Sequence, residues 1–188
     1  VLSQDTLGEL MEEGNYTAVL DSAAACLEGT AGTTQRAEIT RFRTMPESAH
    51  ENFARALYEL LYGDGPLARR FDEYVLAMRI DGGASWPAAT WLAAAALPTE
   101  HVFVKPTYFK KQALVLELEL NYDSSPNGAT YEQFMRAAVR CQERLIAAGL
   151  KPRDLIDVSA FISATLTPTA IRSVATDAKP KRVAKKDA

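Results

Sequence analysis

The sequence predicts a mostly α-helical fold: a compact single domain with at most a short strand or hairpin, and a flexible basic C-terminal tail. Apolar residues recur at spacings of three and four along most of the chain, as on one face of a helix. Proline and glycine interrupt these runs where helices are expected to begin and end. The 188 residues are 47% hydrophobic and 24% charged, which is typical of a folded globular protein. We therefore expect a helical domain over residues 1–165 and a tail over 166–188.

Residues 1–29 predict two short N-terminal helices. Asp5 is expected to cap the first helix and Asn15 the second, because either side chain can accept a hydrogen bond from an unpaired backbone N–H. Residues 30–44, TAGTTQRAEITRFRT, form a polar connection. Their pattern is compatible with a short strand or with a helical turn.

The main helical core is expected over residues 46–164, and it opens with three helices. The first two begin at Pro46 and Pro66, because proline at the first helical position gives up an N–H that would have no partner there. Ser85 is expected to cap the third. That helix is apolar on all sides through Leu97, as expected of a helix in the middle of a bundle.

The next segment, HVFVKPTYFKKQ over residues 101–112, combines apolar and basic residues. Its β-branched and aromatic start predicts extended chain. Lys105 precedes a proline, which disfavours helical geometry, and Thr107 is expected to cap the following helix. Residues 114–120, LVLELEL, fit a helix and also alternate like a strand. We interpret them as helix to about residue 117.

Two further helices complete the domain. Thr130 and Gln133 form a predicted capping box for a long helix that runs to Ala148. Pro152 is expected to start the last helix. From Thr165 onward the apolar pattern fades, which predicts the tail.

Charge is unevenly distributed along the chain. The net charge is −3, but the last ten residues, KPKRVAKKDA, carry about +4, so the rest carries about −7. An acidic body repels polyanions over most of its surface. Binding of nucleic acid would therefore need a local basic patch or the tail.

Several classes of chemistry lack their signatures. The two cysteines form no CxxC pair, the two histidines are 51 positions apart, and the HExxH, GxSxG and glycine-rich phosphate-binding motifs are absent. We expect no metal and no cofactor. No segment reads as membrane-spanning, and the acidic N-terminal stretch does not resemble a secretory signal, so a cytoplasmic protein is expected.

The strongest candidate site is a basic cluster at the start of the helix that follows Pro106. Unpaired N–H groups and the helix dipole favour an anion there, and a histidine could add a titratable donor. The flexible polycationic tail could hold phosphates without base specificity. The candidate residues for binding nucleic acid or another anionic ligand are His101, Lys105, Thr107, Lys110, Lys111, Lys179, Lys181, Arg182, Lys185 and Lys186.

Purely structural interpretations stay open for these residues. His101 could pack in the core, and Lys110 and Lys111 could form an ordinary solvated helix face. Arg136, Arg140 and Arg144 share one helix face, which is compatible with a second basic stripe or with a salt-bridged surface.

Two other function classes also stay open. A protein–protein adaptor or self-associating subunit would use aromatic anchors; the candidates are Tyr58, Tyr62, Trp86, Trp91 and Tyr108. A small acid/base enzyme would use His101 with Asp154 and Asp157, two carboxylates close enough to shift each other's pKa. The alternative for these two residues is that an aspartate in a first helical turn complements the helix dipole.

Residues 53–162 resemble a family of bacterial proteins without a known activity. The resemblance is carried by ALYELLYGDGPLARRFDEYV, SWPAATWLAAAALPTEHVFVKPTYFKKQA, NYDSSPNGATYEQF and LKPRDLIDVSAFI. The pattern of that family is Trp-Pro, then His-x-Phe-x-Lys-Pro, then Arg-Asp-x-Ile-Asp-Val-x-Ser-Phe-Ile, and this chain departs from it at Ala160, which stands in place of the Ser. The resemblance implies a compact bacterial domain and no particular reaction.

Residues 85–113 are more loosely similar in layout to the core of helix-hairpin-helix DNA glycosylases. An Ala/Leu-rich helix leads through a short Val-rich stretch to a basic helix. GGASWPAAT replaces the glycine-rich DNA-gripping hairpin, and Lys105-Pro106 stands where that family places its catalytic aspartate. The resemblance therefore implies a shared helical arrangement without the activity. Together these observations predict a non-enzymatic bacterial accessory protein that binds an anion.

Overall fold

The computed structural model describes residues 2–28, 36–78 and 83–177, and it confirms the predicted mostly α-helical fold. No β-strand occurs within these ranges. None of the helices described combines the length and the apolar character needed to cross a bilayer. The helices in chain order are α1 (Gln4–Glu12), α2 (Tyr16–Glu28), α3 (Arg36–Arg43), α4 (Glu47–Tyr62), α5 (Leu67–Ala77), α6 (Trp86–Ala96), α7 (Pro106–Val115), α8 (Gly128–Ala147), α9 (Leu155–Thr165) and α10 (Pro168–Asp177).

The N-terminal helices α1 and α2 form as predicted, but the first cap differs. Ser3 caps α1, since its Oγ accepts a hydrogen bond from the Thr6 N–H at 3.4 Å. Asp5 lies in the first turn, where its charge still complements the helix dipole. The Asn15 cap of α2 is confirmed, because its side chain accepts from the Ala18 N–H at 3.3 Å.

The connection whose structure the sequence left open contains a helix, α3, in its described part. Phe42 of α3 is buried and meets Phe53 of α4 edge to face, with ring centroids 4.9 Å apart. Arg43 forms an ion pair with Glu28 at 2.7 Å. These contacts fix α3 against α2 and α4.

Helices α4 and α5 begin one residue later than predicted. Pro46 and Pro66 are the N-cap residues, with extended ψ angles of 140° and 130°, and are not the first helical residues. The buried face of α4 carries Phe53, Leu57, Leu60 and Leu61, whose spacings of four, three and one place them on one side of a helix, and α5 buries Phe71, Tyr74 and Val75.

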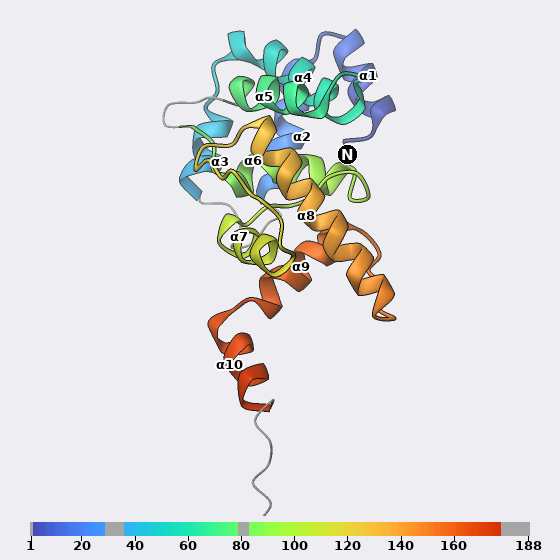
Figure 1. The fold of residues 1–188 in the computed structure, drawn as a ribbon. Helices are drawn as coiled ribbons and strands as arrows, with labels where there is room; N and C mark the ends of the chain where they lie inside the picture. Colours follow the sequence, from blue (N-terminus) through green and yellow to red (C-terminus); the bar gives the residue numbers. More distant parts are fainter. Residues whose placement is uncertain (1, 29–35, 79–82, 178–188) are drawn as a thin grey trace, which may run out of the picture.

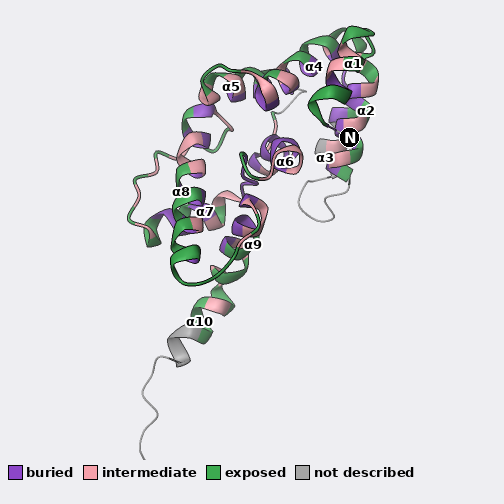
Figure 2. Ribbon diagram, turned by 90° about the vertical axis from the view of Figure 1, so that its right-hand side faces the viewer, coloured by how far each residue is buried: buried purple, intermediate pink, exposed green. Residues whose placement is uncertain are grey.

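Helix α6 lies in the middle of the molecule with other helices around it (Figure 2). The predicted Ser85 cap is confirmed, because its Oγ accepts from the Ala88 N–H at 3.4 Å. Buried residues occupy most of the circumference of this helix, and its remaining face is half-buried, as its largely apolar sequence predicts.

Stacked aromatic rings join α5, α6 and α8. Phe71 of α5 stacks on Tyr131 of α8 at 4.2 Å between centroids, and Trp86 of α6 meets Phe134 of α8 edge to face at 5.0 Å. Phe109 of α7 meets the same Phe134 at 5.5 Å. Such pairs are worth roughly 0.5–1.5 kcal/mol each beyond the area they bury.

Helix α7 includes only Leu114 and Val115 of the 114–120 segment whose pattern was ambiguous. The helix was expected to run to about residue 117, but it ends at Val115, and Glu117 has a φ of 55°, which is not helical. The expected Thr107 cap is wrong: Lys105 is the N-cap residue, and Thr107 lies inside the first turn.

Helix α8 begins at Gly128, before the predicted capping box. Asn127 is its cap and accepts from the Thr130 N–H at 2.9 Å. Gln133 accepts from the Asn121 N–H at 2.7 Å, so it orders the preceding loop and does not bond back to Thr130. The predicted start of the last core helix at Pro152 is also wrong, because Asp154 caps α9 by accepting from the Asp157 N–H.

The first part of the predicted flexible tail is helical. Helix α10 covers Pro168–Asp177 and extends away from the other helices (Figures 1 and 2). Its sequence carries too few apolar residues to produce the stripe from which the other helices were predicted. The basic residues beyond it lie outside the described ranges.

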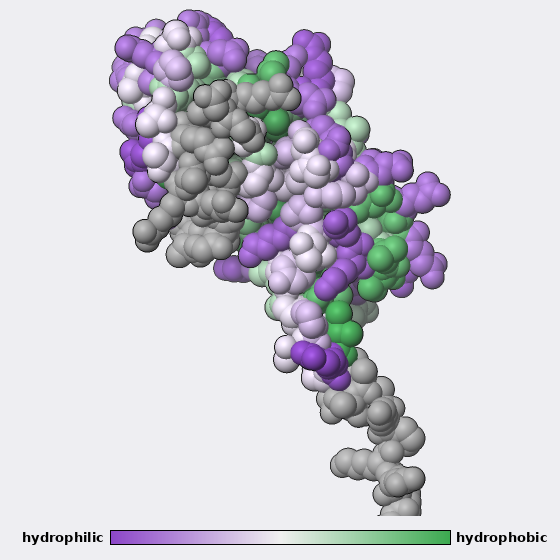
Figure 3. All heavy atoms as spheres, turned by 90° about the vertical axis from the view of Figure 1, so that its left-hand side faces the viewer, coloured by the Kyte–Doolittle hydropathy of each residue, from purple (hydrophilic) through white to green (hydrophobic). Residues whose placement is uncertain are grey.

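Some large apolar side chains remain at the surface of α7, α8 and α9 (Figure 3 shows hydrophobic side chains on one edge of the molecule). Leu114 and Val115 at the end of α7 are 78% and 66% exposed. Ile146 of α8 and Phe161 of α9 are 58% and 36% exposed. The C-terminal ends of α7 and α8 are thus less covered than the aromatic core.

Candidate functional site

The extended segment between α6 and α7 is held by buried side chains. No strand lies beside it in the described part of the chain, yet buried backbone groups need hydrogen-bond partners. The Val102 N–H donates to the Tyr131 hydroxyl at 3.3 Å, and the Val104 N–H donates to Thr90 Oγ1 at 2.9 Å. Ser159 Oγ donates to the Phe103 carbonyl at 2.6 Å. These three side chains belong to α8, α6 and α9, so three helices fix the segment that contains His101.

His101 is buried, with only 3% of its surface exposed. Its Nδ1 lies 3.1 Å from the Tyr131 hydroxyl, and the two rings are nearly parallel. Its Nε2 has no hydrogen-bond partner among the described residues, and the residue lines a cavity of about 470 Å³. The side chain therefore belongs to this cavity and does not join the lysines of α7.

Arg70 of α5 lines the same cavity. Its Nε donates to the Gly65 carbonyl at 2.8 Å, and its Nη1 donates to the Glu59 and Leu60 carbonyls at 3.1 and 2.7 Å. The guanidinium thus closes the C-terminal end of α4, where carbonyl groups lack partners within the helix. Nη2 has no hydrogen-bond partner within the described ranges.

The pKa of His101 is lowered to about 4. Burial is the main cause, because it penalises the imidazolium form, and the nearby charge of Arg70 adds to it. The ring is therefore neutral at pH 7 and does not act as a cation there.

The candidate lysines lie around α7 and contact different groups. Lys105, the N-cap residue, has extended backbone angles and places its Nζ 5.5 Å from the centre of the Phe103 ring. Lys110 places its Nζ 4.3 Å from the centre of the Tyr122 ring, in the connection to α8. Thr107 is exposed on the first turn of the helix.

Lys111 is held at the junction with α9. Its Nζ donates to the Leu166 carbonyl at 3.2 Å and lies 6.0 Å from the centre of the Tyr108 ring. Leu166 is the C-cap residue of α9, so the ammonium group satisfies a carbonyl at a helix C-terminus. The structure thus brings the lysines onto one helix but gives each a different contact.

These lysines have no carboxylate partner among the described residues. The ion pairs that the structure shows are made by arginine, each with a nearby glutamate or aspartate. Their members are Arg43–Glu28, Arg55–Glu51, Arg69–Glu73, Arg140–Glu143 and Arg153–Asp157. The charges of Lys105, Lys110 and Lys111 therefore stay uncompensated by direct contact in this part of the chain.

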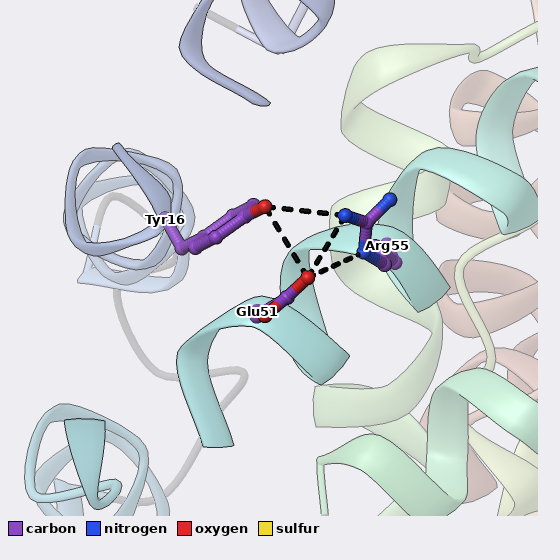
Figure 4. A network of polar contacts seen from close by, with 3 residues as sticks. All are labelled: Tyr16, Glu51 and Arg55. Carbon is purple, nitrogen blue, oxygen red and sulfur yellow. Dashed lines mark hydrogen bonds and ion pairs between the residues drawn. The ribbon is translucent and has the colours of Figure 1, made fainter. Parts of the chain in front are cut away.

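One of these arginine pairs belongs to a network that connects α2 to α4 (Figure 4). Glu51 Oε1 accepts from Arg55 at 2.8 Å and from the Tyr16 hydroxyl at 3.3 Å, and Arg55 Nη2 also donates to that hydroxyl at 3.2 Å. The three groups satisfy one another, so we assign this network to packing of the two helices.

The remaining candidates of the predicted basic site are Lys179, Lys181, Arg182, Lys185 and Lys186. All five lie outside the described residues.

The carboxylates of the acid/base hypothesis have structural contacts. Asp154 caps α9, and Asp157 accepts two hydrogen bonds from the Arg153 guanidinium at 2.9 and 2.8 Å. The ion pair lowers the pKa of Asp157 to about 2. Neither aspartate lines the cavity of His101, whose carboxylates are Asp64 and Glu100.

Of the aromatic anchors of the adaptor hypothesis, Trp86 is buried and the other four are half-buried. Trp86 is 2% exposed, and its Nε1 donates to the Asp123 carbonyl at 3.0 Å. Trp91 donates to the Cys26 carbonyl at 3.1 Å, and the Tyr62 hydroxyl donates to the Leu2 carbonyl at 2.6 Å. Tyr58 is also partly buried. A protein partner or self-association stays a prediction.

Sequence reasoning overlooked three residues that place His101: Thr90, Tyr131 and Ser159. Each is a polar residue at a buried position of a helix. A polar residue at a position expected to be buried is a signal that could have revealed them, because a buried hydroxyl needs a hydrogen-bond partner. The cavity residues Arg70 and Glu100 carried no such signal.

Within the described ranges, no three His, Cys, Asp or Glu side chains are grouped as metal ligands. Comparisons with protein-family models, with curated proteins and with solved structures find no match to this chain. The resemblances to a bacterial family and to the glycosylase core therefore stay predictions, and function has to be inferred from the geometry.

Proposed function

We propose that this protein is a non-enzymatic accessory protein that binds a polyanion, with single-stranded nucleic acid as the expected class. The observation that carries the proposal is the group of α7 lysines without carboxylate partners. An uncompensated ammonium gains by meeting a phosphate, because binding releases the counterions condensed on the nucleic acid.

The rings beside these lysines support a single-stranded partner. Tyr108 and Tyr122 are partly exposed and lie next to Lys111 and Lys110. Proteins that bind single strands without sequence preference combine cations with aromatic rings on which bases stack. The basic tail predicted from the sequence would add further phosphate contacts.

The test is a fluorescence-anisotropy titration of a labelled single-stranded DNA and an RNA of the same sequence at several salt concentrations. We expect affinity to fall as salt rises. The double variant K110A/K111A should lower the slope of log affinity against log salt by about 1.4, because each lost phosphate contact contributes about 0.7 for a single strand.

A matched control is K151A, which removes an exposed lysine between α8 and α9. This variant should bind like the wild type. A variant with alanine at all five tail cations separates the tail from α7. Absence of binding at about 50 mM salt, or affinity that does not respond to salt, would refute the proposal.

A further inference from the structure

The cavity next to His101 has a different character from the α7 lysines. It lies between the turn from α4 to α5 and the start of the α6–α7 connection, and it measures about 470 Å³. This size falls within the range of small-molecule sites. The side chains that bear on its chemistry are Tyr62, Asp64, Arg70, Glu100 and His101.

Two residues that line this cavity each have a nitrogen atom without a described hydrogen-bond partner. Arg70 uses Nε and Nη1 to hold three carbonyls, and Nη2 has no described partner. His101 uses Nδ1 for Tyr131, and Nε2 has none. A guanidinium N–H is the preferred donor to a carboxylate, so Arg70 Nη2 can bind an anionic group of this kind.

The same cavity carries negative charge on its exposed side. Asp64 and Glu100 are exposed, and neither forms an ion pair with a described residue. A dianionic phosphate would be repelled by these two carboxylates, so it is an unfavourable ligand for this cavity. A positively charged amine would be attracted to the same groups.

We propose that this cavity binds a small zwitterion of the free amino acid class. The ligand carboxylate accepts from Arg70 Nη2, and the ligand ammonium lies between Asp64 and Glu100. His101 Nε2 adds one hydrogen bond, as donor or acceptor according to its tautomer. This site is independent of the proposed polyanion surface, since the residues that define it lie outside α7.

The test is isothermal titration calorimetry of the full chain with each common L-amino acid in turn. We expect at least one of them to bind. Its N-acetyl derivative, which lacks the ammonium charge, and its methyl ester, which lacks the carboxylate, should both bind more weakly. The variant E100Q should weaken binding about two- to fivefold, as expected for loss of one exposed charge pair, and D64N/E100Q should weaken it further.

The matched control is E12Q, which removes an exposed glutamate of α1 outside the cavity. Circular dichroism checks that every variant is folded, which we expect because Asp64 and Glu100 are exposed. K110A/K111A should leave amino acid binding unchanged, which separates this site from the polyanion proposal. The inference is overturned if no amino acid binds, if the N-acetyl form binds equally well, or if D64N/E100Q binds like the wild type.

Discussion

Helices α5 and α7 each carry two adjacent cations, and the two pairs behave differently. In α5, Arg69 pairs with Glu73 at 2.8 Å and Arg70 holds three backbone carbonyls. In α7, Lys110 lies over a tyrosine ring and Lys111 reaches one carbonyl. The arginine pair is used to assemble the domain, whereas the lysine pair keeps most of its charge available.

The difference follows from helix geometry and from the two side chains. Adjacent residues on a helix point about 100° apart, so neighbouring cations meet different surroundings. Arginine offers five N–H donors in a planar fork and can serve several carbonyls at once. Lysine is a compact, strongly hydrated charge, which suits reversible contact with a phosphate.

The largest expected effect comes from Gly128, where α8 starts against α5. A Cβ at this position would overlap the backbone of Ala68, which cannot move without shifting α5. We expect G128A to lose more than about 3 kcal/mol of unfolding free energy, measured by urea denaturation.

The control is G8A in α1, where a Cβ meets nothing within 4 Å. It should stabilise by up to about 1 kcal/mol, because glycine is a poor helix former. A mild effect of G128A would show that the junction between α5 and α8 is looser than the structure indicates.

The second effect tests the comparison within α5. R70A removes two hydrogen bonds to carbonyls at the end of α4 and one to the Gly65 carbonyl in the following turn, and we expect it to cost about 2–4 kcal/mol of unfolding free energy. R69A breaks only an exposed ion pair, so it should cost about 0.5 kcal/mol or less. Equal losses in the two variants would mean that Arg70 has no special structural role.

The third effect is a pH dependence that comes from His101. Its folded pKa is about 4, below the ordinary value of 6.5, so the unfolded chain binds more protons between these values. Stability from this group is complete above about pH 6.5 and decreases as the pH falls toward 4, by up to about 3 kcal/mol. Chemical denaturation across this range should show the decrease in the wild type. H101Q should lack that component, and identical pH profiles for the two proteins would contradict the assignment.

Much of the helical content could be predicted because it depends on neighbouring residues. The stripe of Phe53, Leu57 and Leu60 is buried as its spacing predicts, and Asn15 and Ser85 cap the helices they precede. Exact starts were harder where two residues could cap. Ser3 replaced Asp5 and Asn127 replaced Thr130, because each candidate can accept the same kind of hydrogen bond.

The candidate site was predicted less well than the fold. His101 was grouped with Lys105 and Lys110 because they are close in the sequence. The structure separates them, since Tyr131, thirty positions away, holds the histidine on the side of Arg70. The sequence was sufficient to identify the lysines of α7 as candidates. It could not show that these lysines lack carboxylate partners.

The sequence by itself determined most of the helices (α3 and α10 excepted), the central position of α6 and the basic character of α7, because hydrophobic periodicity and charge are local properties. Only the tertiary structure decided which cations form hydrogen bonds and ion pairs within the domain, that His101 is neutral, and that a polar cavity forms beside it. These properties depend on burial and on partners far apart in the chain, such as Arg70 with the carbonyls of α4 and His101 with Tyr131.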